Sequence, residues 1–258
     1  MLTRNPWTGL RELTAARLAL GRCGHSLPTR ELLAFQLAHA QARDAVHHSL
    51  DAASLALDVA SLARDASSVT ISPAIVLQSA APDRDTYLRR PDFGRRLDAA
   101  SAEVLTRGNW DAVLVVADGL SATAVHRHAL VLMKALIDVL IHGDALMPRP
   151  ENWRVAPICI VRQARVAIGD EIGERMGARL AVVLIGERPG LSSPDSLGAY
   201  LTWAPRIGRT DAERTCVSNI RNGGLEPVLA ALQIATLMRA ARDRELTGVN
   251  LKTSLLLS

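Results

Sequence analysis

The sequence has few of the residues on which several common protein classes depend. Aromatic residues make up only 3 % of its 258 residues, and the three cysteines are Cys23, Cys159 and Cys216. The cysteines lie far apart and form no Cys-x-x-Cys pair, which excludes a disulfide scaffold and a zinc ribbon. This usage is typical of a reducing compartment.

Lysine is also scarce. Lys134 and Lys252 are the only two, so arginine supplies almost all of the positive charge. A net charge of +4 would permit a nucleic-acid partner. However, basic residues are interleaved with acidic ones along the whole chain, and few aromatic side chains could stack on bases. We therefore expect no nucleic-acid binding.

Long apolar runs are absent as well. The first 21 residues carry several charges, so they lack the apolar core of a signal peptide. The most apolar stretch, Ala129–Ile141, contains Lys134 and Asp138 and is shorter than the roughly 20 residues of a membrane span. We expect a soluble cytoplasmic protein without membrane contact.

The pattern of apolar residues changes near residue 110. Before it, we predict helices over Glu31–Arg64 and Asp92–Thr106, separated by a turn-rich stretch with three prolines. After it, short apolar strands alternate with helices. We predict strands at 112–117, 157–161, 180–185 and 199–203, and helices at 122–141, 170–176 and 227–245.

Alternating strands and helices are typical of a parallel sheet with helices on both faces. The fold class expected is therefore a Rossmann-like α/β domain with a helical N-terminal extension. We divide the chain into a tail (1–25), the extension (26–85) and the Rossmann-like domain (86–258).

Familiar catalytic motifs are missing. The sequence has no Walker loop, no Gly-x-Gly-x-x-Gly after a strand and no His-Glu-x-x-His. The stretch Asp118-Gly-Leu-Ser121 lacks the final glycine of a nucleophile elbow, which favours a strand-to-helix turn with Ser121 as cap. The histidines show no metal-ligand spacing. We expect no catalytic residue and no metal ligand in this chain.

Two features leave a ligand-binding role open. Gly169, Gly173 and Gly177 recur every fourth residue and would form a bare ridge on a helix, either for tight packing or for a ligand. Glu187 follows an apolar strand in Gly186-Glu-Arg-Pro-Gly190, and ligands of open α/β sheets bind beyond the carboxyl ends of strands. Glu187 could accept a hydrogen bond from a ligand there or be a solvated carboxylate.

Five ordered segments resemble one family, the small (light) subunit of ethanolamine ammonia-lyase, over roughly Ser26–Asn250. They are Tyr87-Leu-Arg-Arg-Pro-Asp-Phe-Gly-Arg-Arg-Leu97, Asp118-Gly-Leu-Ser121, Gly186-Glu-Arg-Pro-Gly-Leu191, Asp195-Ser-Leu197 and Arg214-Thr-Cys-Val-Ser-Asn-Ile220. The resemblance implies a subunit that assembles, in several copies, with a TIM-barrel large subunit. It implies that adenosylcobalamin lies between them and that ethanolamine becomes acetaldehyde and ammonia by radical chemistry in the large subunit.

The family's cobalamin contacts match Val166, Glu187 and Cys216 of this sequence, so the resemblance implies that these residues bind the cofactor. All three follow expected strands and would meet at one rim of the sheet. No histidine stands in an Asp-x-His-x-x-Gly motif, so we expect the cofactor's own benzimidazole to stay on cobalt.

Two alternatives remain open. Asn5–Leu20 resembles a weak amphipathic helix that, in this family, can address the enzyme to a bacterial microcompartment, or it is a disordered terminus. The chain could also be a cobalamin- or partner-binding module without lyase activity. A nucleotide-dependent enzyme is disfavoured because the glycine-rich phosphate loop is missing.

Overall fold

A mixed six-stranded sheet forms the centre of the protein. The computed structural model describes residues 2–3, 5–14, 16–65, 73–143 and 153–251. The strand order is β3-β5-β4-β6-β7-β8. The strands are β3 (Ile75–Gln78), β4 (Trp110–Ala117), β5 (Cys159–Arg162), β6 (Ala178–Gly186), β7 (Leu197–Trp203) and β8 (Arg214–Ile220). The first four in spatial order are parallel, and β7 and β8 are antiparallel to their neighbours.

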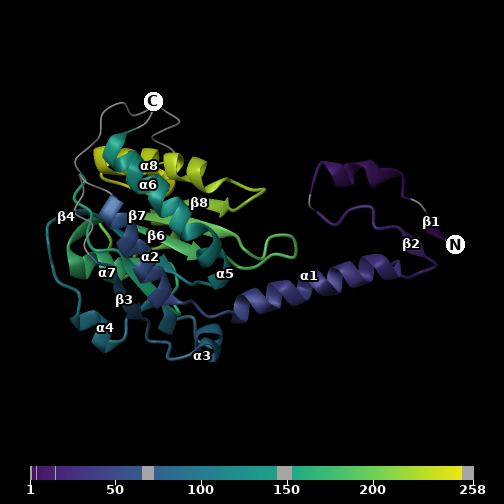
Figure 1. Ribbon diagram of the computed structural model, residues 1–258, viewed down its shortest axis with the longest axis horizontal. Coiled ribbons are helices and arrows are strands. Elements are labelled where there is room, and N and C mark those ends of the chain that lie inside the picture. Colours follow the sequence, from purple (N-terminus) through teal and green to yellow (C-terminus); the bar gives the residue numbers. More distant parts are fainter. Residues whose placement is uncertain (1, 4, 15, 66–72, 144–152, 252–258) are drawn as a thin grey trace.

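Helices cover both faces of this sheet (Figure 1). The α-helices of the described residues are α1 (Thr29–His47), α2 (Ala52–Asp65), α3 (Arg84–Arg89), α4 (Ala99–Glu103), α5 (Ala122–Ala124), α6 (Leu130–His142), α7 (Ile168–Met176) and α8 (Pro227–Arg244). Short 3-10 helices span Pro6–Glu12, Phe93–Arg95 and Asp211–Glu213, and a π-helix, Val125–Ala129, joins α5 to α6.

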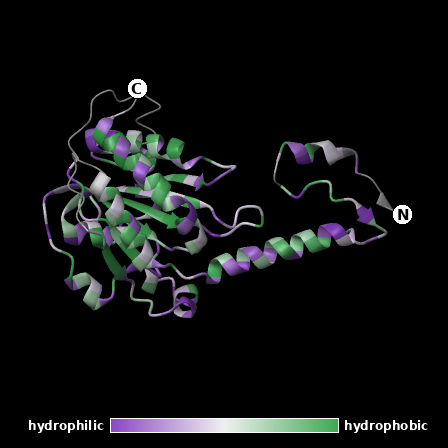
Figure 2. Cartoon of the chain, in the orientation of Figure 1, coloured by the Kyte–Doolittle hydropathy of each residue, from purple (hydrophilic) through white to green (hydrophobic). Residues whose placement is uncertain are grey.

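Strand β4 shows why the core has two layers. Leu114 and Val116 face the cluster formed with α2, α6 and α8, whereas Val113 and Val115 face the cluster formed with α7. All four side chains are fully buried, as a continuous apolar strand requires in a sheet covered on both faces. Figure 2 shows the same arrangement as hydrophobic strands between amphipathic helices.

The prediction of an α/β fold is confirmed, but the prediction of a parallel sheet holds only for four strands. The expected strand at 199–203 is β7, which pairs antiparallel with β6 through Val183 opposite Tyr200. Residues 187–196 form no helix between these strands. A parallel partner needs a longer crossover connection, so the chain returns antiparallel. The edge strands β3 and β8 were not predicted from the sequence.

Two expected helices are interrupted. The helix expected over Glu31–Arg64 is α1 and α2, because His48 is extended and Asp51 accepts the N–H of Ser54 as a cap. The helix expected over Asp92–Thr106 is a 3-10 turn and the short α4, which Asp98 caps.

The N-terminal segment lies away from the sheet. Helix α1 extends from the body of the protein, and the strands β1 (Leu2–Thr3) and β2 (Arg22–Cys23) pair at its far end (Figure 1). The expected amphipathic helix over Asn5–Leu20 is wrong, because among the described residues 5–14 and 16–20 only Pro6–Glu12 is helical, and it is a 3-10 helix. Arg11 pairs with Glu31 at 2.8 Å and holds this segment against α1.

The glycines of α7 serve close packing. A Cβ on Gly169 would overlap Cγ2 of Val183 in β6, and one on Gly173 would overlap Pro205. Gly177 is not on the ridge: it ends the helix with φ +72°, which favours glycine. The packing interpretation is confirmed for Gly169 and Gly173.

Replacement of Gly169 by alanine tests this packing. We expect Gly169→Ala to lower the free energy of unfolding by about 1–3 kcal/mol, because overpacking shifts α7 from the sheet. Gly9→Ala is the matched control, since nothing lies within 4 Å of its added Cβ. Thermal unfolding followed by circular dichroism measures both, and equal midpoints would contradict the packing role.

Candidate functional site

An open hollow of about 410 Å³ lies at the carboxyl ends of the central parallel strands. We call it the rim hollow; it is lined by Tyr87, Gly119, Leu120, Arg165, Val166, Ile185, Gly186, Glu187, Arg188 and Tyr200. Strand β4 leads to helices on one face and its neighbour β5 leads to α7 on the other. The rim hollow therefore lies at a topological switch point, where ligands of α/β proteins bind.

Asp118 joins the loops that line this hollow. Its carboxylate accepts backbone N–H groups from Gln163 at 2.9 Å and Ala164 at 3.0 Å, and Nη1 of Arg84 lies 3.7 Å away. Burial raises the pKa of Asp118, while these donors and Arg84 act in the opposite direction. The loop after β4 thus fixes the loop after β5.

The next turn joins β4 to β6. Leu120 donates its N–H to the carbonyl of Gly186 at 2.9 Å, and Gly119 has φ +56° with no room for a side chain beside that carbonyl. Ser121 caps α5 by accepting the N–H of Ala124, and its hydroxyl donates to the carbonyl of Pro194 at 2.8 Å. The prediction of a capped turn is confirmed.

Glu187 is held by both antiparallel strands. Its Oε2 accepts the hydroxyl of Ser196 at 2.6 Å and the N–H of Asn219 at 3.2 Å. Its own N–H donates to the carbonyl of Ser196 at 2.9 Å. An ionised carboxylate has about four acceptor positions, so these two bonds leave capacity on Oε1. Glu187 is half-buried in the wall of the rim hollow, so the interpretation as a solvated turn carboxylate is disfavoured.

Cys216 does not line the rim hollow, but its neighbour on the adjacent strand does. It is exposed on β8 and is paired across the sheet with Tyr200, which lines the hollow. Burial, with the neighbouring Cys216 adding to it, raises the pKa of Tyr200. The structure therefore brings Val166 and Glu187 into one hollow and places Cys216 next to its wall.

The loop that carries Glu187 is also tied to the π-helix. Asp195 accepts hydrogen bonds from Nη1 of Arg127 at 2.8 Å and Nε2 of His128 at 3.3 Å. Burial alone would raise the pKa of Asp195, but these two partners outweigh it and hold the pKa below its ordinary value. Asp195 belongs to one of the five segments, and its role here is to hold the loop.

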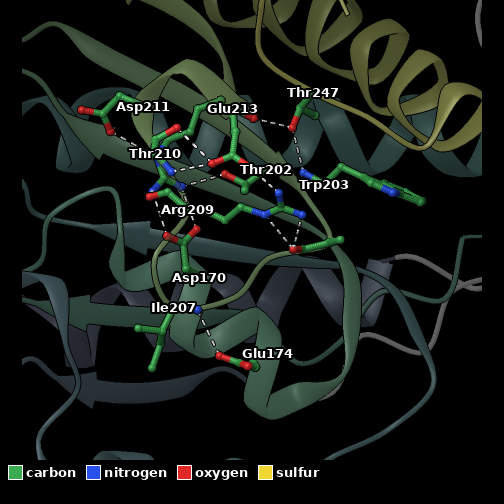
Figure 3. Close-up of polar contacts among 12 residues, drawn as sticks. Asp170, Glu174, Thr202, Trp203, Ile207, Arg209, Thr210, Asp211, Glu213 and Thr247 are labelled. Carbon is green, nitrogen blue, oxygen red and sulfur yellow. Dashed lines mark hydrogen bonds and ion pairs between the residues drawn. The ribbon is translucent and has the colours of Figure 1, made fainter. Parts of the chain in front are cut away.

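A buried ion pair connects α7 to β8 on the side of the sheet away from the rim. Arg214 donates to both carboxylate oxygens of Asp170, at 2.6 and 2.7 Å, and to Thr202 at 3.0 Å. Both charged side chains are 3 % exposed. Figure 3 shows Asp170 beside Thr202 and the ion-paired residues Arg209 and Glu213. The ion pair between Arg214 and Asp170 fixes β8, the strand that carries Cys216.

Sequence reasoning missed three residues of the hollow: Tyr87, Arg165 and Tyr200. Tyr87 opens the first of the five segments and Arg165 directly precedes Val166, so their position in the sequence was the available signal. The pairing of Tyr200 with Cys216 required β8, which the sequence analysis did not assign.

Comparison with known proteins decides the family. The ethanolamine ammonia-lyase light chain family matches residues 4–252. The ethanolamine ammonia-lyase small subunit of Ralstonia nicotianae is 54 % identical over 97 % of this chain and 89 % of its own length. The same subunits of Azotobacter vinelandii and Pseudomonas paraeruginosa are 53 % and 52 % identical, over 97 % and 96 % of this chain and 89 % and 87 % of their own lengths. This chain belongs to the ethanolamine ammonia-lyase small-subunit family.

The family resemblance inferred from five segments is thereby confirmed, and each segment has a place in the structure. In this small-subunit chain, four of them supply residues that line the rim hollow or hold its loops, and the fifth supplies Arg214 and Cys216. Within the described residues, no helix is both long enough and apolar enough to cross a membrane.

The ion pair of the small-subunit chain gives a test of what holds β8. Asp170→Ala should lower the free energy of unfolding by about 3–5 kcal/mol, because it leaves the Arg214 guanidinium buried without its main partner. Asp211→Ala removes a weaker partner of the same arginine, 3.3 Å away and 89 % exposed, and should change stability by less than about 0.5 kcal/mol. Urea unfolding measures both; a small effect of Asp170→Ala would contradict the anchoring role.

Proposed function

We propose that this chain is the small subunit of an adenosylcobalamin-dependent ethanolamine ammonia-lyase and closes the cobalamin site against a catalytic large subunit. The complex would convert ethanolamine to acetaldehyde and ammonia. The observation that carries the proposal is the rim hollow, where Val166 and Glu187 meet at the switch point of a sheet in a chain of this family.

The residues of the rim hollow fit a corrinoid. A corrin has broad apolar faces fringed with amide groups, so it needs an apolar wall and a few polar partners. Val166 and Ile185 supply apolar surface, and Glu187 supplies an acceptor. Arg165 supplies a cationic donor, and no ion pair to it is formed by the part of the chain that the structure describes.

The work of this chain in the proposed complex is binding and orientation. When bound, adenosylcobalamin would supply the radical that starts the reaction. Glu187 would accept an amide N–H through Oε1, while Ser196 and Asn219 hold Oε2 and so fix the direction of the carboxylate. Val166 would cover the corrin from one side, and Cys216 would extend this wall beyond Tyr200.

Loss of the Glu187 carboxylate should weaken cofactor binding. We expect Glu187→Ala to reduce the affinity of the assembled complex by about 1.5–3 kcal/mol, the range for a hydrogen bond to a charged group. Spectrophotometric titration with cyanocobalamin measures this affinity. Glu187→Gln keeps an acceptor and should recover part of it. Unchanged affinity of Glu187→Ala would count against the contact.

The partner requirement has a separate test. We expect the isolated chain to produce no acetaldehyde from ethanolamine and adenosylcobalamin, because its sequence contains no catalytic constellation, and to aggregate, because its apolar-rich composition suits an obligate partner. The coexpressed large subunit should copurify with it and restore activity. Activity of the chain alone would overturn this expectation. A complex that binds cobalamin but never releases ammonia would instead support a binding module.

Three further expectations stay predictions. The division into a tail (1–25), an extension (26–85) and a Rossmann-like domain (86–258) is a proposal. Residence in a bacterial microcompartment within the cytoplasm, directed by the tail, is another, as is an assembly with several copies of each subunit.

A further inference from the structure

We propose that Arg165 forms an anion site in the rim hollow that receives the phosphodiester of the cobalamin nucleotide tail. The inference rests on the proposed function and assigns a partner to a residue that sequence comparison alone did not single out.

Arg165 sits in a cradle built by the first of the five segments. Its N–H donates to the carbonyl of Gly94 at 2.7 Å. Its guanidinium stacks on the ring of Tyr87, with Cζ 4.2 Å from the ring centroid, and Nη2 donates to the carbonyl of Tyr87 at 3.4 Å. Tyr87 is fully buried and donates its hydroxyl to the carbonyl of Ala164. The ring is therefore a fixed platform.

Gly94 leaves room for this side chain. A Cβ at Gly94 would lie 2.9 Å from Cγ of Arg165 and 2.9 Å from Cε2 of Tyr87. The bare glycine backbone thus allows the arginine stem and the tyrosine ring to pack together. Tyr87 and Gly94, both in the first of the five segments, together position the guanidinium of Arg165.

This guanidinium has no balancing carboxylate. Within the described ranges Arg165 forms no ion pair. Other buried arginines of the domain do, such as Arg84 with Asp118 and Arg214 with Asp170. Its Nε is buried and has no hydrogen-bond partner among the described residues. A half-buried guanidinium that lines an open hollow without a carboxylate partner is suited to an anion that enters the hollow.

The ligand chemistry matches this arrangement. The amide groups of cobalamin are neutral, and its one fixed negative charge is the phosphodiester that links the corrin to its benzimidazole nucleotide. Arginine binds phosphate oxygens through parallel N–H donors, which makes it more selective for this group than for an amide. Glu187, at the same hollow, is suited to amide N–H groups and repels phosphate. Glu187 and Arg165 would therefore orient the cofactor.

Three corrinoids separate this contact from others. Cyanocobalamin carries the whole tail, cobinamide phosphate carries the phosphate without the base, and cyanocobinamide carries neither. We expect the wild-type two-subunit complex to bind cobinamide phosphate more tightly than cyanocobinamide, and Arg165→Ala to reduce this preference by about 10- to 100-fold. Spectrophotometric titration gives each dissociation constant without an activity assay.

A second disrupting variant and a control variant complete the test. Gly94→Ala should cause the same selective loss because its Cβ displaces the arginine stem. Arg162→Ala, which removes an exposed cation from the same sheet edge outside the rim hollow, should leave the preference unchanged.

A loss shared equally by all three corrinoids in Arg165→Ala would overturn the phosphate contact and leave the proposed function standing. A loss for cyanocobalamin alone would place Arg165 at the base and also overturn it. If the wild-type complex binds no corrinoid, both proposals fail.

Discussion

The buried carboxylate of Asp118 is the constraint on which the rim of the sheet depends. The loops after β3, β4 and β5 meet there, although these strands lead to different helices. Such loops carry backbone N–H groups that need hydrogen-bond partners. Asp118 provides acceptors for Gln163 and Ala164, directly before Arg165. A solvated aspartate could not replace it, because water would compete for the same donors. The positions of Arg165 and Val166 therefore follow from a residue that lies outside the hollow.

A second buried charge does the corresponding work for the antiparallel strands. Strand β8 is at the edge of the sheet and has only β7 as a neighbour. The pair between Arg214 and Asp170 ties it to α7, on whose N-terminal side Val166 lies. The two candidate contacts Val166 and Cys216 are therefore fixed relative to one another through the interior of the protein. Burying ions in this way is costly, so the pair is a means of positioning rather than a source of stability.

The sequence predicted the elements whose signal is local and missed those that depend on pairing. β4 and β6 are continuous apolar runs, and Gly143 marks the end of α6, so each could be assigned from a short window. β8 alternates buried and exposed residues only over Thr215–Ser218, which is too short a signal by itself, and is a strand because β7 lies beside it. Glu187 was found from its position after an apolar strand, and Val166 through the family resemblance. Arg165 was not, because its importance comes from Tyr87 and Gly94, which are distant in the sequence.

The open shape of the hollow explains why fixed polar groups matter at this site. A hollow of about 410 Å³ contacts only part of a ligand as broad as a corrin, so area buried against this chain alone cannot determine orientation. Glu187 and Arg165 are both held by contacts within the chain, and the entropy lost in ordering them is lost on folding rather than on binding. One accepts hydrogen bonds and the other donates them to anions. A ligand with amides on one side and a phosphate on the other has a single orientation that satisfies both.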